Sequence, residues 1–116
     1  MSVTFSVQGL GYYAGHDGDE YHDYVNLSGV NARVLLTRLG LTPGEVLVGD
    51  IRARELATRC KAELTPEKMA LDEGEEGFSE GRFHFFGRSP GLINERIREL
   101  LDLCSQAGDL GVITWS

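Results

Sequence analysis

The most constraining feature of the sequence is its tail, residues 82–115. RFHFFG at 82–87 predicts a strand, and residues 90–107 carry apolar side chains at helical spacing. GVITW at 111–115 is a continuous apolar run, which is typical of a strand at the centre of a sheet. An amphipathic helix must bury its apolar stripe against another layer. The tail therefore predicts a helix on a sheet, and its two strands, if they are neighbours, form a parallel βαβ unit with a right-handed crossover.

The beginning of the chain predicts another part of the same sheet. Residues 3–8, VTFSVQ, alternate between apolar and polar side chains, as a half-buried strand does. YHDYVNL at 21–27 predicts an antiparallel return strand, with an extended loop as the alternative. The Asp17-Gly18 pair between them is a hairpin-type turn signal.

Two further helices are expected before the tail. Ser28 is a typical N-cap residue, and Gly40 is a typical residue just beyond a helix C-terminus. Asp50 is expected to cap a second helix, which runs to about Leu64. Residues 66–80 are acidic and contain glycines, so we expect a long loop there.

These elements define the expected fold class as α+β, with α/β as the alternative. We expect a small mixed sheet of three to four strands and three helices, in a two-layer sandwich that forms a single domain over residues 1–116. With 41% hydrophobic and 25% charged residues, the composition is that of an ordinary globular chain. Such a chain folds without disulfides. Cys60 and Cys104 fall on apolar helix faces, and we expect both to be buried free thiols.

The segment NLSGVNARVLLTRLGL, residues 26–41, places a capping serine and Asn-Ala before paired leucines and Leu-Gly. It resembles the helix start of small uncharacterised bacterial and phage proteins. The resemblance implies a bacterial or phage protein, and it implies no particular activity.

Negative charge is concentrated in two segments of the chain. The net charge is −7, and residues 16–23 and 65–80 hold ten of the 18 acidic residues but one of the 11 basic residues. Binding to nucleic acid needs a basic face, so we expect no nucleic-acid partner. No apolar run approaches the roughly 20 residues of a membrane span. The N-terminus lacks the regions of a signal peptide. We therefore expect a cytoplasmic protein without a membrane partner.

The segment GYYAGHDGDEYHDYVNL, residues 11–27, is the main candidate for a functional site, and we call it the Tyr-rich segment. It holds all four tyrosines of the protein. Tyrosine is enriched at protein interfaces because it offers a large amphipathic contact at low entropic cost. The alternative is that these rings pack over a sheet edge and close the core. The predicted binding residues are Tyr12, Tyr13, His16, Tyr21, His22 and Tyr24.

The same segment contains candidate metal ligands: His16, Asp19, His22 and Asp23. Their spacing matches no calcium loop, because His22 stands where that loop requires glycine. Nor does it supply a helical pair of histidines four residues apart. The sequence leaves the metal open and predicts no cofactor.

GRSPG at residues 87–91 is a candidate anion site at the start of the last helix. Backbone N–H groups at a helix N-terminus attract anions, and Arg88 and Ser89 stand beside them. The structural interpretation is that Ser89 caps the helix and Pro90 is its first residue.

The expected function is a non-enzymatic protein-binding or adaptor module that uses the Tyr-rich segment. One alternative is a small metal-assisted or His/carboxylate enzyme at residues 16–23. Another is an acidic inhibitor or immunity-type protein that presents carboxylates to a basic target. Both a monomer and a dimer fit the sequence.

Overall fold

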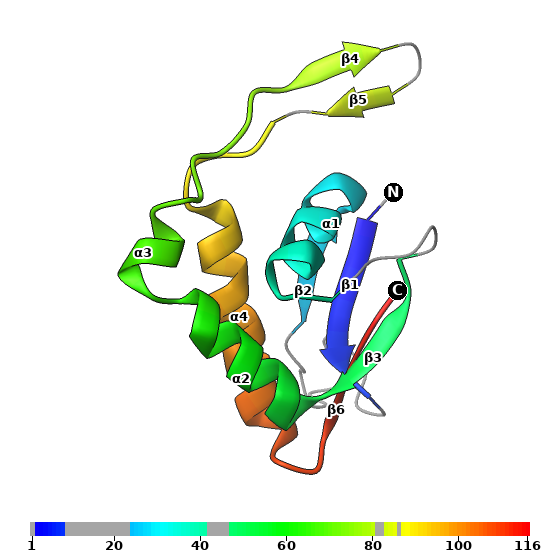
Figure 1. Ribbon diagram of the computed structural model, residues 1–116. Helices are drawn as coiled ribbons and strands as arrows, with labels where there is room; N and C mark the ends of the chain where they lie inside the picture. Colours follow the sequence, from blue (N-terminus) through cyan, green and yellow to red (C-terminus); the bar gives the residue numbers. More distant parts are fainter. Residues whose placement is uncertain (1, 9–23, 42–46, 81–82, 86) are drawn as a thin grey trace, which may run out of the picture.

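The computed structural model describes residues 2–8, 24–41, 47–80, 83–85 and 87–116. Figure 1 shows a body made of a sheet and helices, from which a two-stranded arm projects. The strands are β1 (Ser2–Val7), β2 (Val25–Ser28), β3 (Gly49–Arg52), β4 (Phe78–Glu80), β5 (Phe83–Phe85) and β6 (Val112–Trp115). The helices are α1 (Gly29–Arg38), α2 (Ala53–Glu63), α3 (Pro66–Met69) and α4 (Leu92–Ala107).

The sheet of the body has the order β2-β1-β6-β3, and all its strand pairs are antiparallel. The α+β class is therefore confirmed, and β6 lies at the centre of the sheet as its apolar run predicts. The expected βαβ unit is wrong, because β5 pairs with β4 in a separate sheet and not with β6. β4 ends at Glu80 and β5 begins at Phe83. Closing so short a connection costs less entropy than a crossover through a whole helix.

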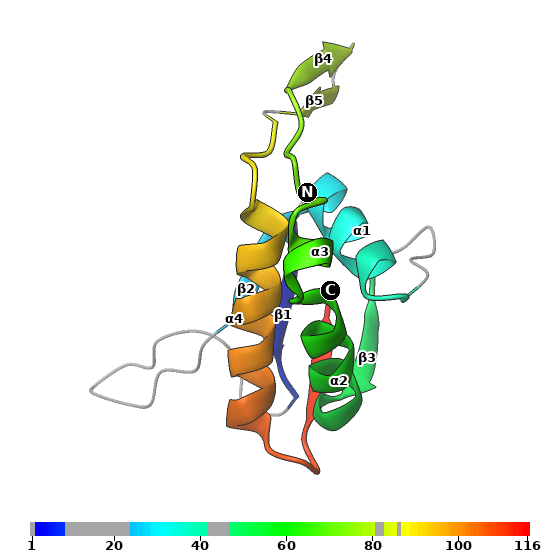
Figure 2. The same ribbon diagram turned by 60° about the vertical axis from the view of Figure 1, so that its left-hand side comes forward.

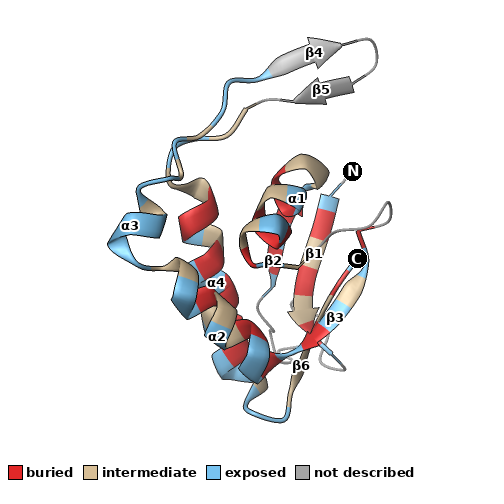
Figure 3. Ribbon diagram, in the orientation of Figure 1, coloured by how far each residue is buried: buried red, intermediate tan, exposed pale blue. Residues whose placement is uncertain are grey.

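The helices α1, α2 and α4 pack against one face of this sheet, which gives two layers (Figures 1 and 2). Alternate strand residues are buried beneath them, as Figure 3 shows for β1 and β6. The ring centroids of Phe5 and Trp115 lie 5.5 Å apart across the pair of strands. The fully buried large side chains are Val3, Phe5, Leu35, Leu36, Leu56, Cys60, Ile93, Ile97, Leu100, Leu103 and Ile113.

The ends of α1 follow the local sequence. The Ser28 side chain accepts a hydrogen bond from the backbone N–H of Asn31 at 3.3 Å, so the predicted cap is confirmed. Gly40 follows the helix with a φ of +76°, a conformation that glycine adopts without strain. The strand predicted at 21–27 is confirmed from Val25 onward, where β2 pairs with β1. Residues 21–23 lie outside the described part of the chain.

Two other local predictions are wrong. Asp50 does not cap α2, because it belongs to β3 and the helix begins only after Arg52. The pairing between β3 and β6 extends through Arg52, so the backbone is in strand conformation up to that residue and the helix can begin only after it. Residues 66–80 are not a long loop, since α3 and β4 form within them. The Thr65 side chain caps α3 by accepting a hydrogen bond from the N–H of Lys68.

Within the described residues, no helix has the length and apolar character that crossing a membrane requires.

Candidate functional site

Residues 11–23 of the Tyr-rich segment lie outside the described residues. Five of the six predicted binding residues, Tyr12, Tyr13, His16, Tyr21 and His22, fall in the range 9–23, as do the metal candidates Asp19 and Asp23. Their roles stay predictions. Within the described ranges, no group of three or more His, Cys, Asp or Glu side chains is arranged to hold a metal ion.

Tyr24 is the first described residue of the Tyr-rich segment and lies directly before β2. Its relative exposure is 45%, which is high for a large aromatic residue. It lines a cavity of about 240 Å³ with two acidic residues of α4, Glu99 and Asp102. The lining of this cavity therefore combines one aromatic ring with two carboxylates.

The most distinctive feature of the structure is a two-stranded arm, of which only β5 falls in a strand predicted from the sequence, that at 82–87. We define it as residues 74–88, two antiparallel segments paired at β4–β5 and again at the bridge between Glu75 and Arg88. The two bridge residues exchange backbone hydrogen bonds of 2.9 and 2.7 Å. Figures 1 and 2 show the arm extending away from the end of the body where α4 begins.

Side chains hold the base of the arm to the body, and we call these contacts the arm root. The Arg88 side chain is 9% exposed, and its Nη1 donates to Oδ1 of Asn31 on α1 at 2.9 Å. Its Nη2 donates to Oε2 of Glu75 at 3.1 Å. Both terminal nitrogens of Arg88 therefore have protein partners, which gives this predicted anion-binding residue a structural role.

A second set of root contacts fixes the start of α4. Oδ2 of Asp72 accepts a hydrogen bond from the backbone N–H of Asn94 at 2.9 Å, and Asn94 Nδ2 donates to the carbonyl oxygen of Met69 at 2.9 Å. Ser89 does not cap the helix and Pro90 is not its first residue, because α4 begins at Leu92 after Gly91. The Asp72 carboxylate thus lies at the positive, N-terminal end of the α4 dipole, where an external anion would otherwise bind.

The backbone of the arm root is closely packed. Gly74 has a φ of +82°, and a Cβ atom there would lie 2.5 Å from the carbonyl oxygen of Arg88. Gly87 has a φ of +94°, and its Cβ would lie 2.9 Å from the carbonyl oxygen of Glu75. Only glycine fits both positions without strain, so the two glycines let the segments of the arm meet where they leave the body.

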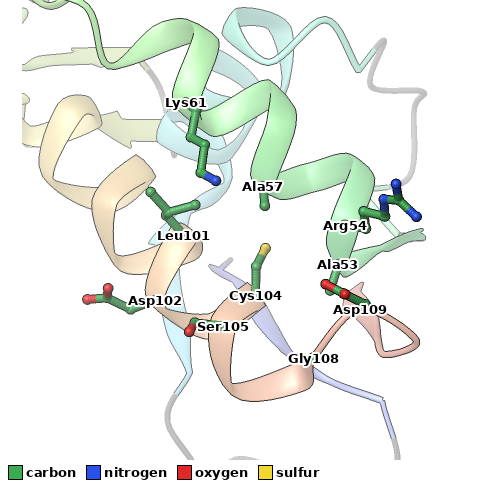
Figure 4. Close-up of a pocket in the computed structure, with 10 residues that line it drawn as sticks. All are labelled: Ala53, Arg54, Ala57, Lys61, Leu101, Asp102, Cys104, Ser105, Gly108 and Asp109. Carbon is green, nitrogen blue, oxygen red and sulfur yellow. The ribbon is translucent and has the colours of Figure 1, made fainter.

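Figure 4 shows a groove between α2 and α4, with a volume of about 410 Å³. Arg54 and Lys61 come from α2 and Asp102 comes from α4, whereas Asp109 follows α4 in the chain and is drawn near Arg54. Cys104 also lines it. Burial raises the pKa of the Cys104 thiol from 9.0 to about 11 and that of Cys60 to about 12. Both thiols are free and buried, so the core interpretation of the cysteines is confirmed. Such neutral thiols are poor nucleophiles and poor metal ligands.

A second groove, of about 450 Å³, lies at the junction of β3 and α2, and we call it the arginine groove. Arg52 and Arg54 are exposed in it. Two hydrogen bonds fix the Arg59 side chain. Nη1 donates to the carbonyl oxygen of Leu39 at 2.9 Å, and Nη2 donates to Oε1 of Glu55 at 3.3 Å. The helical spacing of α2 did not indicate that β3 adds Arg52 to the same groove.

The signal for the arm was present in the sequence but weak. FSE at 78–80 and FHF at 83–85 are two short β-type runs separated by two residues, one of them Gly81. The run at 83–85 belongs to the strand predicted at 82–87. The run at 78–80 is short for a strand, and the acidic residues before it favour a loop. The contact of Arg88 with Asn31 has no local signal, because it joins residues far apart in the chain.

Comparisons of the chain with protein families, with characterised proteins and with solved structures return no match.

Proposed function

We propose that this protein is a non-enzymatic protein-binding module, and that the arm and the Tyr-rich segment are its contact elements. The observation that carries the proposal is a two-stranded arm that projects from the body and is held at its base (Figures 1 and 2). An isolated two-stranded hairpin is marginally stable in water. A partner that covers the arm would stabilise such a hairpin.

The composition of the arm supports a protein partner. Phe78 and Phe85 are opposite each other in the strand register, and Phe83 stands on the same strand as Phe85. Aromatic residues are enriched in the cores of protein interfaces. Among the described strands, β4 and β5 pair only with each other, so each has an outer edge with backbone groups for a further strand.

The arm root supports presentation of the arm as a defined element. The hydrogen bonds from Arg88 to Asn31 and Glu75 connect both segments of the arm to α1. A held arm loses less conformational entropy on binding than a free loop would, and this favours affinity. The Tyr-rich segment, with Tyr24 at 45% exposure beside acidic residues of α4, is the second proposed contact.

Site-specific photocrosslinking tests the proposal. A photoreactive amino acid replaces Glu76 in the arm, and in a control variant it replaces Thr37 of α1; both residues are exposed and 37 is on the body. The protein is illuminated in a cell extract and in purified form. We expect a discrete crosslinked product from position 76 that position 37 does not give. Equal diffuse labelling from both positions, or no product from position 76, would contradict an arm that binds protein.

A further inference from the structure

We infer that the arm binds a second copy of this chain, and that its acidic base docks in the arginine groove of that copy. This inference rests on the proposed function, because it names the partner of the arm.

The arginine groove has unsatisfied positive charge. Arg52 and Arg54 are exposed, and neither side chain forms an ion pair or hydrogen bond with any residue in the described part of the chain. Arg59 is the third arginine that lines the groove, and its guanidinium is hydrogen-bonded to Leu39 and Glu55. Three arginines against one glutamate make the groove cationic in a protein whose net charge is −7.

The base of the arm, together with Glu73 directly before it, has the complementary charge. Glu73 and Glu76 are exposed, and their carboxylates have no ion-pair partner among the residues that the structure describes. Glu75 lies between them and is half exposed even though it pairs with Arg88. A run of carboxylates on an extended segment matches a cationic groove, since arginine pairs with carboxylates through two parallel hydrogen bonds.

The two surfaces lie at opposite ends of the molecule. Figure 1 shows the arm above the start of α4, whereas the junction of β3 with α2 lies at the lower end of the body. The arm therefore cannot fill the groove of its own chain. Two copies placed antiparallel about a two-fold axis bring each arm to the groove of the other, so that the contact is made twice and the assembly closes.

The groove also borders a free sheet edge. In the part of the chain that the structure describes, β3 pairs with β6 alone, and it ends the sheet. The exposed Val48 precedes this edge strand, with a relative exposure of 62%. An extended acidic segment docked at Arg52 lies next to that edge, where backbone hydrogen bonds can add to the charge contacts.

The net charge of the chain does not prevent this pairing. At physiological salt the Debye length is about 8 Å, so repulsion between distant acidic residues is largely screened. Contacts between carboxylate and guanidinium groups at hydrogen-bond distance are retained. An anionic partner other than a second copy would use the same groove, but the purified chain would then be monomeric.

Charge reversal with rescue tests the inference on the purified full chain. Sedimentation equilibrium measures the dimer dissociation constant of the wild type, of R54E, of E76K and of the double variant R54E/E76K. We expect each single reversal to raise the dissociation constant at least about tenfold, because every dimer contains the altered contact twice. The double variant restores an opposite-charge pair and returns the constant toward the wild-type value. Far-ultraviolet circular dichroism checks that each variant is folded.

Two matched reversals serve as controls. Lys61 on α2 and Glu67 on α3 are exposed and lie outside both proposed surfaces, so K61E and E67K should leave the dissociation constant unchanged. A wild type that is monomeric up to its solubility limit would overturn the inference. So would a dimer that responds to R54E and E76K no more than to the controls, or one that the double variant fails to restore.

Failure of the inference is distinguishable from failure of the proposed function. If position 76 crosslinks a different protein and the chain is monomeric, the arm is a binding element but its partner is not a second copy. If position 76 crosslinks nothing in extract or in purified form and the wild-type chain is monomeric, both are wrong.

Discussion

Arg88 and Asn31 are 57 residues apart in sequence, and Nη1 of the arginine donates a hydrogen bond of 2.9 Å to Oδ1 of the asparagine. Asn31 is 8% exposed and belongs to the first turn of α1, whose cap is Ser28. The same guanidinium binds Glu75 across the arm. One side chain therefore links the projecting arm to a helix of the core, and the position of the arm depends on the packing of α1.

Removing this link should destabilise the protein. R88A leaves Oδ1 of Asn31 buried without its donor, and such a loss costs about 1–3 kcal/mol of unfolding free energy. Urea denaturation measures it, and hydrogen exchange of the backbone amides of β4 and β5 should become faster. Arg96 pairs with Glu99 at the surface, so R96A is the control and should change stability by no more than about 0.5 kcal/mol. Equal losses in both variants would argue against a structural role for the Arg88 link.

The cap of α1 supports the same link from the other side. Ser28 Oγ accepts from the N–H of Asn31, so S28A should cost about 1 kcal/mol, whereas S28D should retain the cap. Thermal unfolding of both variants checks this. Thr37 is exposed in the same helix, and T37A serves as the control, with an expected change close to zero. If S28A were as stable as T37A, the cap would not contribute to α1.

Much of the body could be predicted from the sequence because its signals are local. The alternation of Val3, Phe5 and Val7 predicts β1. The apolar stripe of residues 90–107 predicts α4, which ends at Ala107 and starts two residues later than expected. Capping by Ser28 and the left-handed Gly40 need only neighbouring residues, so they too follow from the sequence. The central place of β6 follows from its unbroken apolar run.

What could not be predicted depends on contacts between distant parts of the chain. The start of α4 is set by Asp72, whose carboxylate accepts a hydrogen bond from the N–H of Asn94, 22 residues later in the chain. The antiparallel order of the sheet depends on which strands meet, and hydrophobic patterning does not specify this. The arginine groove exists because β3 places Arg52 beside α2. Of the predicted site residues, Tyr24, Arg88 and Ser89 lie in the described ranges. The binding role of Tyr24 and the roles of the residues outside these ranges remain predictions.

Gly49 should be intolerant of a side chain for a reason unrelated to its backbone. A Cβ atom at this position would lie 2.5 Å from Cζ2 of Trp115, whose ring covers the glycine across the strands. G49A must displace the ring and should cost about 1–3 kcal/mol. Trp115 is the one tryptophan of the protein, so its fluorescence emission should shift in the folded variant.

A second glycine provides the control for G49A. Gly91 has open space around its missing Cβ but a φ of +82°. G91A should cost about 1 kcal/mol through backbone strain, without any change in Trp115 emission. An unchanged emission spectrum in G49A would mean that the ring does not lie against Gly49.

Stability should fall at alkaline pH because of the two buried thiols. Burial raises the pKa of Cys104 from 9.0 to about 11 and that of Cys60 from 9.0 to about 12. Above pH 9 the unfolded chain releases these protons while the folded chain keeps them, so the native state binds more protons and loses stability as pH rises toward 11. The contribution is fully present below pH 9.

Comparison of slopes isolates this effect from other groups that titrate at high pH. The variant C60A/C104A has lower stability throughout, because both side chains are buried and their removal leaves space in the core. Its unfolding free energy, measured by urea denaturation between pH 8 and 10.5, should nevertheless decline less steeply with pH than that of the wild type. Lysine and tyrosine residues are the same in both proteins, so their titration cancels in the difference. If the two plots of unfolding free energy against pH are parallel, the thiol pKa values are not raised. If the wild-type plot approaches or crosses that of C60A/C104A as pH rises, the raised pKa values are supported.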